Sequence, residues 1–83
     1  MKILYFSWIR EKIGVAEEVI DLPDHVSTTD QLIDYLSSLS DRHAIAFEDK
    51  DWLRIAVDQR YSRGDDVLTN DAEIAIFPPV TGG

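Results

Sequence analysis

The chain contains several short apolar runs in which hydrophobic side chains point to both sides of an extended backbone. Runs rich in aliphatic and aromatic residues predict β-strands. The predicted strands cover residues 2–9, 17–22, 53–57, a short piece at Tyr61, and 73–77. The short connection between the first two runs, with Gly14 suited to a left-handed turn, predicts an antiparallel hairpin. Pro78 and Pro79 end the last strand, because proline cannot donate a hydrogen bond to a neighbouring strand.

One long helix is predicted in the middle of the chain. Thr28 and Gln31 have the spacing of a capping box, in which both side chains bond free backbone N–H groups at a helix start. An apolar stripe follows at helical spacing and consists of Leu32, Ile33, Leu36 and Leu39. Residues 41–47 predict a second, shorter helical piece. The order ββαβββ predicts an α+β fold, a mixed five-stranded sheet packed on one main helix.

The first and last predicted strands are apolar on both faces, whereas a sheet with one solvated face normally shows one polar side. We assign the helix-facing side to Ile3, Tyr5, Ile74 and Ile76. The opposite side then carries Leu4, Phe6, Trp8, Ala75 and Phe77. An uncovered apolar patch of this kind predicts a partner interface. The alternative is that the segment 41–53 folds over it.

Composition limits the classes of protein that the chain can represent. Its 83 residues are enough for a single domain, residues 1–83, with 78–83 as an extended C-terminal tail. The 16 acidic and 8 basic residues give a formal net charge of −8, which argues against nucleic acid and against an anionic membrane as partners. The absence of cysteine excludes disulfides, thiolate metal sites and a cysteine nucleophile. The N-terminal apolar run is too short for a signal peptide, so we expect a soluble, cytoplasmic protein.

Few residues could carry catalysis within this chain. His25 and His43 lack a ligand-like spacing, and we interpret both as surface or packed residues. The acidic clusters lack the ligand pattern of a calcium loop, and there is no glycine-rich phosphate loop. We therefore predict no self-contained active site, no metal site and no cofactor bound by this chain.

The C-terminal segment, Pro78-Pro79-Val80-Thr81-Gly82-Gly83, is the most distinctive part of the sequence. The two prolines favour extended polyproline geometry and stiffen the exit from the sheet. The two glycines present only backbone, which can enter a channel that any Cβ would obstruct. The reactive group of such a tail would be the terminal carboxylate of Gly83. A frayed end without function is the alternative.

The ending Phe77-Pro78-Pro79-Val80-Thr81-Gly82-Gly83, preceded by Glu73-Ile74-Ala75-Ile76, closely resembles that of the molybdopterin synthase small subunits, the MoaD type. The resemblance includes Arg10-Glu11-Lys12-Ile13-Gly14, the helix begun by Thr28, and Ala56-Val57 before a turn. It implies a ubiquitin-like β-grasp fold, in agreement with the ββαβββ order. Asp58 stands where the family often has asparagine, a departure that concerns local turn geometry and not the tail.

The resemblance implies a sulfur carrier rather than an enzyme with its own catalytic residues. A partner adenylyltransferase related to ubiquitin-activating enzymes would join the Gly83 carboxylate to AMP, using ATP. A sulfur donor would then displace AMP and leave a thiocarboxylate. The large subunit of molybdopterin synthase, in a heterotetramer, would admit the tip formed by Gly82 and Gly83 and pass the sulfur to the cyclic pyranopterin precursor, forming the dithiolene. The implied partner-binding residues are Phe6, Tyr61, Phe77, Pro78, Pro79, Val80 and Thr81.

Two other functions remain open at this point. A sulfur carrier of thiamine synthesis, or a related ubiquitin-like protein modifier, would share the fold, the tail and the activation chemistry but not the acceptor. A non-catalytic β-grasp interaction module would share only the fold, and its terminal glycines would be accidental. The Pro78-Pro79 stalk and the chain length favour the molybdopterin pathway.

Overall fold

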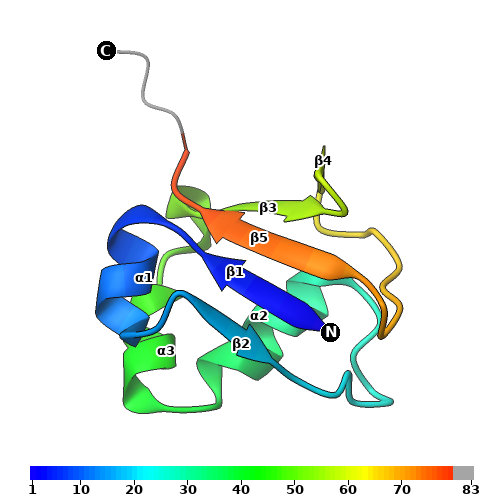
Figure 1. Cartoon of the computed structure of the whole chain (residues 1–83), viewed down its shortest axis with the longest axis horizontal. Helices are drawn as coiled ribbons and strands as arrows, with labels where there is room; N and C mark the ends of the chain where they lie inside the picture. Colours follow the sequence, from blue (N-terminus) through cyan, green and yellow to red (C-terminus); the bar gives the residue numbers. More distant parts are fainter. Residues whose placement is uncertain (80–83) are drawn as a thin grey trace.

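The computed structural model describes residues 1–79, which form one mixed sheet with helices packed against it (Figure 1). The strands are β1 (Lys2–Tyr5), β2 (Glu17–Val19), β3 (Arg54–Val57), β4 (Arg60–Tyr61) and β5 (Glu73–Phe77). Their order across the sheet is β2-β1-β5-β3-β4. β1 and β5 run parallel, and the other neighbouring strands are antiparallel. The predicted α+β class, the five-stranded mixed sheet and the antiparallel pairing of the first two strands are confirmed, but the connection between these two strands contains a helix and is not the short one predicted.

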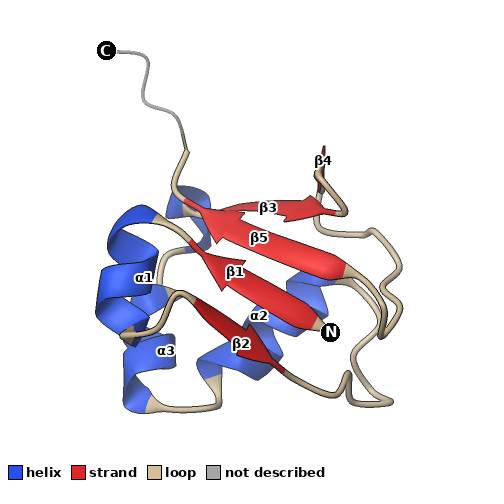
Figure 2. Cartoon of the chain, viewed as in Figure 1, coloured by secondary structure: helices blue, strands red, loops and turns tan. Residues whose placement is uncertain are grey.

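Three of the four helices in the described residues contribute to a single core on one face of this sheet. They are α1 (Ser7–Ile13), α2 (Thr29–Ser37) and α3 (Asp41–Ala46), whereas the fourth, the short 3₁₀ helix η1 (Lys50–Trp52), has no buried residue. Figure 2 shows α2 behind the sheet, with α3 beside it. The core cluster combines the predicted strand residues Ile3, Tyr5, Ile74 and Ile76 with apolar residues of α1, α2 and α3. None of the helices in the described range is long and apolar enough to cross a membrane.

The first strand is shorter than the sequence predicts, because helix α1 replaces its second half. β1 ends at Tyr5, and α1 begins at Ser7 and stops at Gly14, whose φ of 97° is the left-handed conformation expected there. Ile9 and Ile13 are one helical turn apart and are both buried under the sheet. The assignment of Trp8 to the uncovered sheet face is therefore wrong, because Trp8 lies on α1 and packs against the core cluster.

The main helix begins as predicted and ends at Ser37, within the expected region 37–40 but before Leu39, the last residue of the predicted stripe. The capping box is present, with the Thr28 side chain accepting from the Gln31 N–H and the Gln31 side chain accepting from the Thr28 N–H. α2 stops at Ser37, and the Ser38 hydroxyl donates to the Tyr35 carbonyl in the last turn. Leu39 therefore lies beyond the helix and is 39% exposed, so it does not belong to the buried stripe that contains Leu36.

Two loop segments hold the sheet in register at the end away from the tail. The second strand stops at Val19, short of the predicted Leu22, and the Leu22 N–H donates instead to the Asn70 side chain at 2.9 Å. β3 and β4 are joined by the two-residue turn Asp58-Gln59. This hairpin places Tyr61 opposite Ala56 on the sheet, so the predicted short strand at Tyr61 is confirmed.

Candidate partner-binding face

The side of the sheet opposite the helices is apolar at its centre. The register of the strands shows which residues lie on this side, because residues paired across neighbouring strands point to the same side of a sheet. Leu4 pairs with Ala75, Ala75 with Ala56, and Ala56 with Tyr61. We call the set the outer face, and it consists of Leu4, Phe6, Ala56, Tyr61, Ala75 and Phe77. Of these, Ala56 was missed by the sequence reasoning, although the alternation Arg54-Ile55-Ala56-Val57 could have revealed it.

Three aromatic residues dominate the exposed area of the outer face. Tyr61 is 78% exposed and Phe6 is 46% exposed, whereas Phe77 is half-buried. The rings of Tyr61 and Phe77 lie 5.8 Å apart with an interplanar angle of 53°. Phe6 follows β1 in extended conformation, and its N–H donates to the Ile76 carbonyl next to Phe77. The structure therefore brings the three predicted aromatic residues to one side of the sheet.

The alternative prediction, that the segment 41–53 covers this face, is wrong for the part of the chain that the structure describes. Phe47 and Leu53 are buried in the core cluster, and Phe47 packs against the Tyr5 ring. Tyr5 belongs to the helix-facing side, so the segment lies on the same side as α2. Among residues 1–79, no other segment is left to shield the outer face.

The rim of the outer face is charged and only partly neutralised. Lys2 pairs with Glu17 at 3.3 Å across β1 and β2. Arg54 pairs in register with Phe77, and its guanidinium donates to the Leu53 carbonyl at 2.8 Å. An apolar centre with a charged rim is the usual composition of a protein–protein interface.

The tail leaves the sheet beside the aromatic residues. β5 ends at Phe77, and the half-exposed Pro78 and Pro79 follow at once. The predicted contact residues Val80 and Thr81 and the predicted reactive residues Gly82 and Gly83 lie outside the described residues. The first part of the tail is thus continuous with the outer face.

A partly buried polar cluster lies on the helix-facing side of the sheet. Glu18 of β2 accepts a hydrogen bond from the Tyr5 hydroxyl at 2.9 Å and one from His43 Nε2 at 2.5 Å. His43 Nδ1 bonds the Ser40 hydroxyl at 2.7 Å, so both ring nitrogens have partners. Burial, followed by the adjacent Glu18 carboxylate, raises the pKa of Tyr5 far above its ordinary value. The expectation that His43 is a packed residue is confirmed, because the ring is held between α3 and β2.

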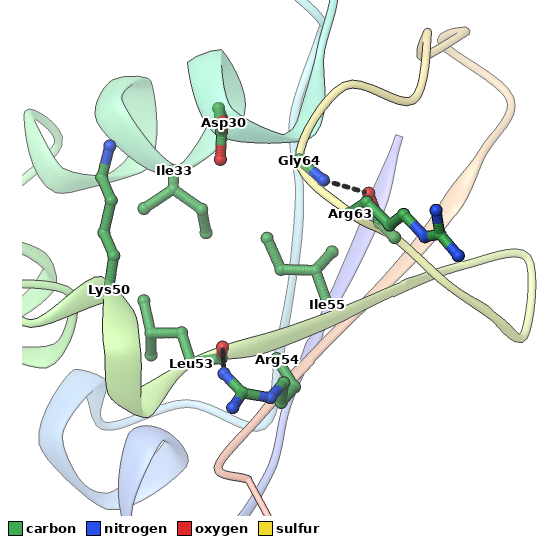
Figure 3. Close-up of a pocket in the computed structure, with 9 residues that line it drawn as sticks. Asp30, Ile33, Lys50, Leu53, Arg54, Ile55, Arg63 and Gly64 are labelled. Carbon is green, nitrogen blue, oxygen red and sulfur yellow. Dashed lines mark hydrogen bonds between the residues drawn. The ribbon is translucent and has the colours of Figure 1, made fainter.

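A separate hollow of about 300 Å³ opens between α2, η1 and β3 (Figure 3). It carries three cationic residues, Lys50, Arg54 and Arg63, which suggests an anion site at first sight. However, Lys50 pairs with Asp34 at 2.7 Å, and the Arg54 guanidinium is held by backbone carbonyls. Figure 3 shows the Asp30 carboxylate pointing into the hollow and the Arg63 guanidinium turned away from it. The charges therefore do not converge on a common ligand position.

Comparison with known proteins gives consistent results over the whole chain. The model of the ThiS family matches residues 3–83. A molybdopterin synthase sulfur carrier subunit from Haemophilus influenzae is 37% identical over 83 residues, covering 100% of this chain and 99% of that protein. The protein of the same name from Escherichia coli is 40% identical over 85 residues, with 100% and 99% covered.

Solved structures support the same fold. A Pyrococcus furiosus protein assigned as molybdopterin converting factor, subunit 1, superposes with a TM-score of 0.77 and 33% identity, covering 95% of each chain. SAMP1 from Haloferax volcanii superposes with a TM-score of 0.74 over 100% of this chain and 98% of that one. Its identity of 23% makes it evidence for the fold alone. The ubiquitin-like β-grasp fold is thereby confirmed.

Proposed function

The chain belongs to the ThiS family, and on that premise we propose that it is the sulfur carrier subunit of molybdopterin synthase. The observation that carries the proposal is the position of the outer face. It is apolar, it is uncovered by residues 1–79, and it ends at Phe77, where the tail begins. A partner bound to this face would receive the tail at the same time. The similarity to named sulfur carrier subunits over the full chain supports this function over the thiamine pathway.

The chemistry takes place at the Gly83 carboxylate. A free carboxylate is a poor electrophile, because its oxygen is a poor leaving group. A partner adenylyltransferase joins one carboxylate oxygen to the α-phosphate of ATP and releases pyrophosphate. A sulfide-equivalent donor attacks the acyl carbon, the acyl–oxygen bond to AMP breaks, and AMP departs with that oxygen. The product is a C-terminal thiocarboxylate.

The large subunit then uses this thiocarboxylate as a positioned nucleophile. Binding of the outer face fixes the root of the tail, so the sulfur reaches the pyranopterin precursor as part of the complex and not from dilute solution. In each delivery the sulfur bonds to a carbon of the precursor, from which an oxygen substituent leaves, and water then cleaves the acyl–sulfur bond and returns Gly83 to a carboxylate. Two successive deliveries supply the two sulfur atoms of the dithiolene. The carrier itself needs no catalytic side chain, because the groups that assist the reaction belong to the large subunit.

The sulfur-carrier chemistry is tested by intact-protein mass spectrometry. The protein is incubated with ATP, the adenylyltransferase and a sulfur donor, and the C-terminal peptide is then sequenced by fragmentation. We expect the exchange of one oxygen for one sulfur, confined to Gly83. An unchanged mass with an active adenylyltransferase would support the plain interaction module instead.

The outer face is tested with Phe77→Asp. A buried, unpaired carboxylate at a central aromatic position should weaken binding of the large subunit by about 2–4 kcal/mol. The fold should persist, because Ile74 and Ile76 hold the opposite side of the same strand. The matched control is Leu39→Asp, which adds the same charge at an exposed residue on the helix side. Calorimetric titration with equal affinities for the two variants would contradict the interface assignment.

A further inference from the structure

A second apolar surface lies off the sheet, between α1, α3 and η1. It is a groove of about 300 Å³, which we call the tryptophan groove, lined by Trp8, Lys12, Ile45, Ala46, Glu48, Asp49 and Trp52. Trp52 is 52% exposed and Ile45 is 51% exposed, although both are large and apolar. Neither belongs to the core cluster, so the fold does not require them to be apolar. Exposed apolar residues that gather in a groove indicate a binding surface.

The tryptophan groove lies at the end of the sheet where the tail leaves. One of its walls, α1, starts directly after Phe6, whose N–H is bonded to the end of β5. Its other wall, η1, ends at Trp52, two residues before Arg54, which pairs with Phe77. Figure 1 shows α1 and the start of β3 at the arrowhead end of β5. Two walls of the groove therefore lie next in the chain to residues at the tail end of the outer face, Phe6 before α1 and Arg54 after η1.

The charges around the groove specify the chemistry of its occupant. Glu48 and Asp49 line it, and Asp51 follows them on η1. The one cation in that stretch, Lys50, pairs with Asp34 of α2 and so faces the hollow on the other side. Lys12 lies over the Trp8 ring, with Nζ 5.8 Å from the ring centre. Among residues 1–79 the carboxylates of Glu48, Asp49 and Asp51 form no ion pair, although Asp49 accepts a hydrogen bond from the Asp51 N–H at 3.0 Å. The η1 wall thus combines an exposed tryptophan with negative charge, a combination that suits an Arg or Lys side chain.

We propose that the tryptophan groove is a second docking surface, which takes a basic segment of the large subunit. An apolar side chain of that segment fits between Trp52 and Ile45, and an Arg or Lys beside it pairs with Glu48. The inference rests on the proposed function, since it extends the outer-face interface around Phe6. A second copy of this chain is the less suitable occupant, because each copy carries a net charge of −8.

The test is calorimetric titration of the full-length carrier with its cognate large subunit at low and at moderate salt. Trp52→Ala should raise the Kd about ten-fold or more, because truncating a buried aromatic anchor typically has an effect of this size. Leu39→Ala, a truncation at the opposite end of α3, should leave the Kd within about two-fold of the wild-type value.

A second variant tests the charge independently of the aromatic ring. Glu48→Lys should weaken binding and also flatten its salt dependence, because it removes one attraction to a basic segment. The matched control is Asp71→Lys, which makes the same change in net charge. Asp71 lies in the turn before β5, at the end of the strand opposite to the tail. This control should have a clearly smaller effect.

The outcomes separate this inference from the proposed function. Normal binding by Trp52→Ala and Glu48→Lys, with Phe77→Asp impaired, overturns the groove and leaves the proposed function intact. Equal effects of Glu48→Lys and Asp71→Lys overturn the specific charge pairing. A dimer of the carrier alone that is lost in Trp52→Ala overturns the choice of occupant. Failure of the wild-type chain to bind any cognate large subunit overturns both proposals.

Discussion

For Tyr5, the sequence predicts the orientation of the side chain but not its hydrogen-bond partner. The alternation of β1 predicts that Tyr5 faces the helices, and the structure confirms it at 2% exposure. The sequence does not predict that its hydroxyl donates to Glu18, which also accepts from His43. That contact depends on the register of β2 against β1 and on the docking of α3, and neither is encoded within a short window of residues.

At this scale we predict that Tyr5→Phe changes the pH dependence of stability. The pKa of Tyr5 is raised in the folded state by burial and by the Glu18 carboxylate. An unfolded tyrosine ionises near pH 10. The stabilisation linked to this shift is therefore complete below about pH 10 and is lost as the pH rises above it, because only the unfolded chain releases the proton.

Tyr5→Phe lacks this proton, so its free energy of unfolding should fall less steeply at alkaline pH. Near neutral pH the variant should be less stable by about 1 kcal/mol, through loss of the hydrogen bond. Urea denaturation of both proteins between neutral pH and pH 11 measures the two curves. The stability difference should shrink above about pH 10, and curves that stay parallel would contradict the linkage.

At the scale of helices and strands, the sequence predicts an element well where several local features indicate the same boundary. The Thr28–Gln31 capping box, the Gly14 stop and the last strand at 73–77 are all present as predicted. The first part of helix α1 was missed because its residues continue the apolar run of β1. The pair Ile9 and Ile13, spaced for a helix and followed by Gly14, carries the helical signal within that run.

The hairpin between β3 and β4 shows why its unusual turn sequence is tolerated. Asp58 and Gln59 both have positive φ, 49° and 71°, as the common two-residue hairpin turn requires. Asp58 also accepts a hydrogen bond from the Glu73 N–H at 2.9 Å, which ties the turn to the start of β5. Aspartate adopts the left-handed conformation more readily than most residues, whereas glutamine has no such advantage.

We therefore predict that Gln59→Gly stabilises the protein by up to about 1 kcal/mol, because relief of the left-handed strain exceeds the entropy that glycine adds to the unfolded chain. Gln59→Ala keeps the Cβ and should give no gain. Thermal melts of the three proteins provide the measurement. If the alanine and glycine variants melt at the same temperature, strain at this position is not the cause of the difference.

At the scale of the whole molecule, the double-sided apolar pattern predicts an uncovered face but not how the helices are distributed. The sequence leaves open whether the segment 41–53 covers that face. The answer depends on long-range packing of Phe47 and Leu53 into the core beside α2. The same packing leaves Trp52 exposed in the tryptophan groove, and no local sequence pattern predicts this groove.

The whole molecule is also the scale at which the tail acts, and there we predict that its length is critical. Deletion of Gly83, or addition of one residue after it, should abolish sulfur transfer by the reconstituted synthase. One residue changes the reach of an extended tail by about 3.3–3.6 Å, whereas reacting atoms must approach within about 3–3.5 Å. Gly82→Val should be nearly as damaging, because a β-branched side chain widens the tip.

Neither Pro78 nor Pro79, the described residues of the tail, belongs to the core cluster, and we expect these variants to melt at nearly the wild-type temperature. Thr81→Ser keeps the length and reach of the tail and should remain active, which makes it the matched control. Product formation is measured beside a thermal melt for each variant. Because only reach and width differ among these proteins, wild-type rates in the shortened and extended chains would exclude the terminal carboxylate as the sulfur-bearing group. Selective loss of activity in folded variants would tie the chemistry to the exact position of Gly83 relative to the outer face.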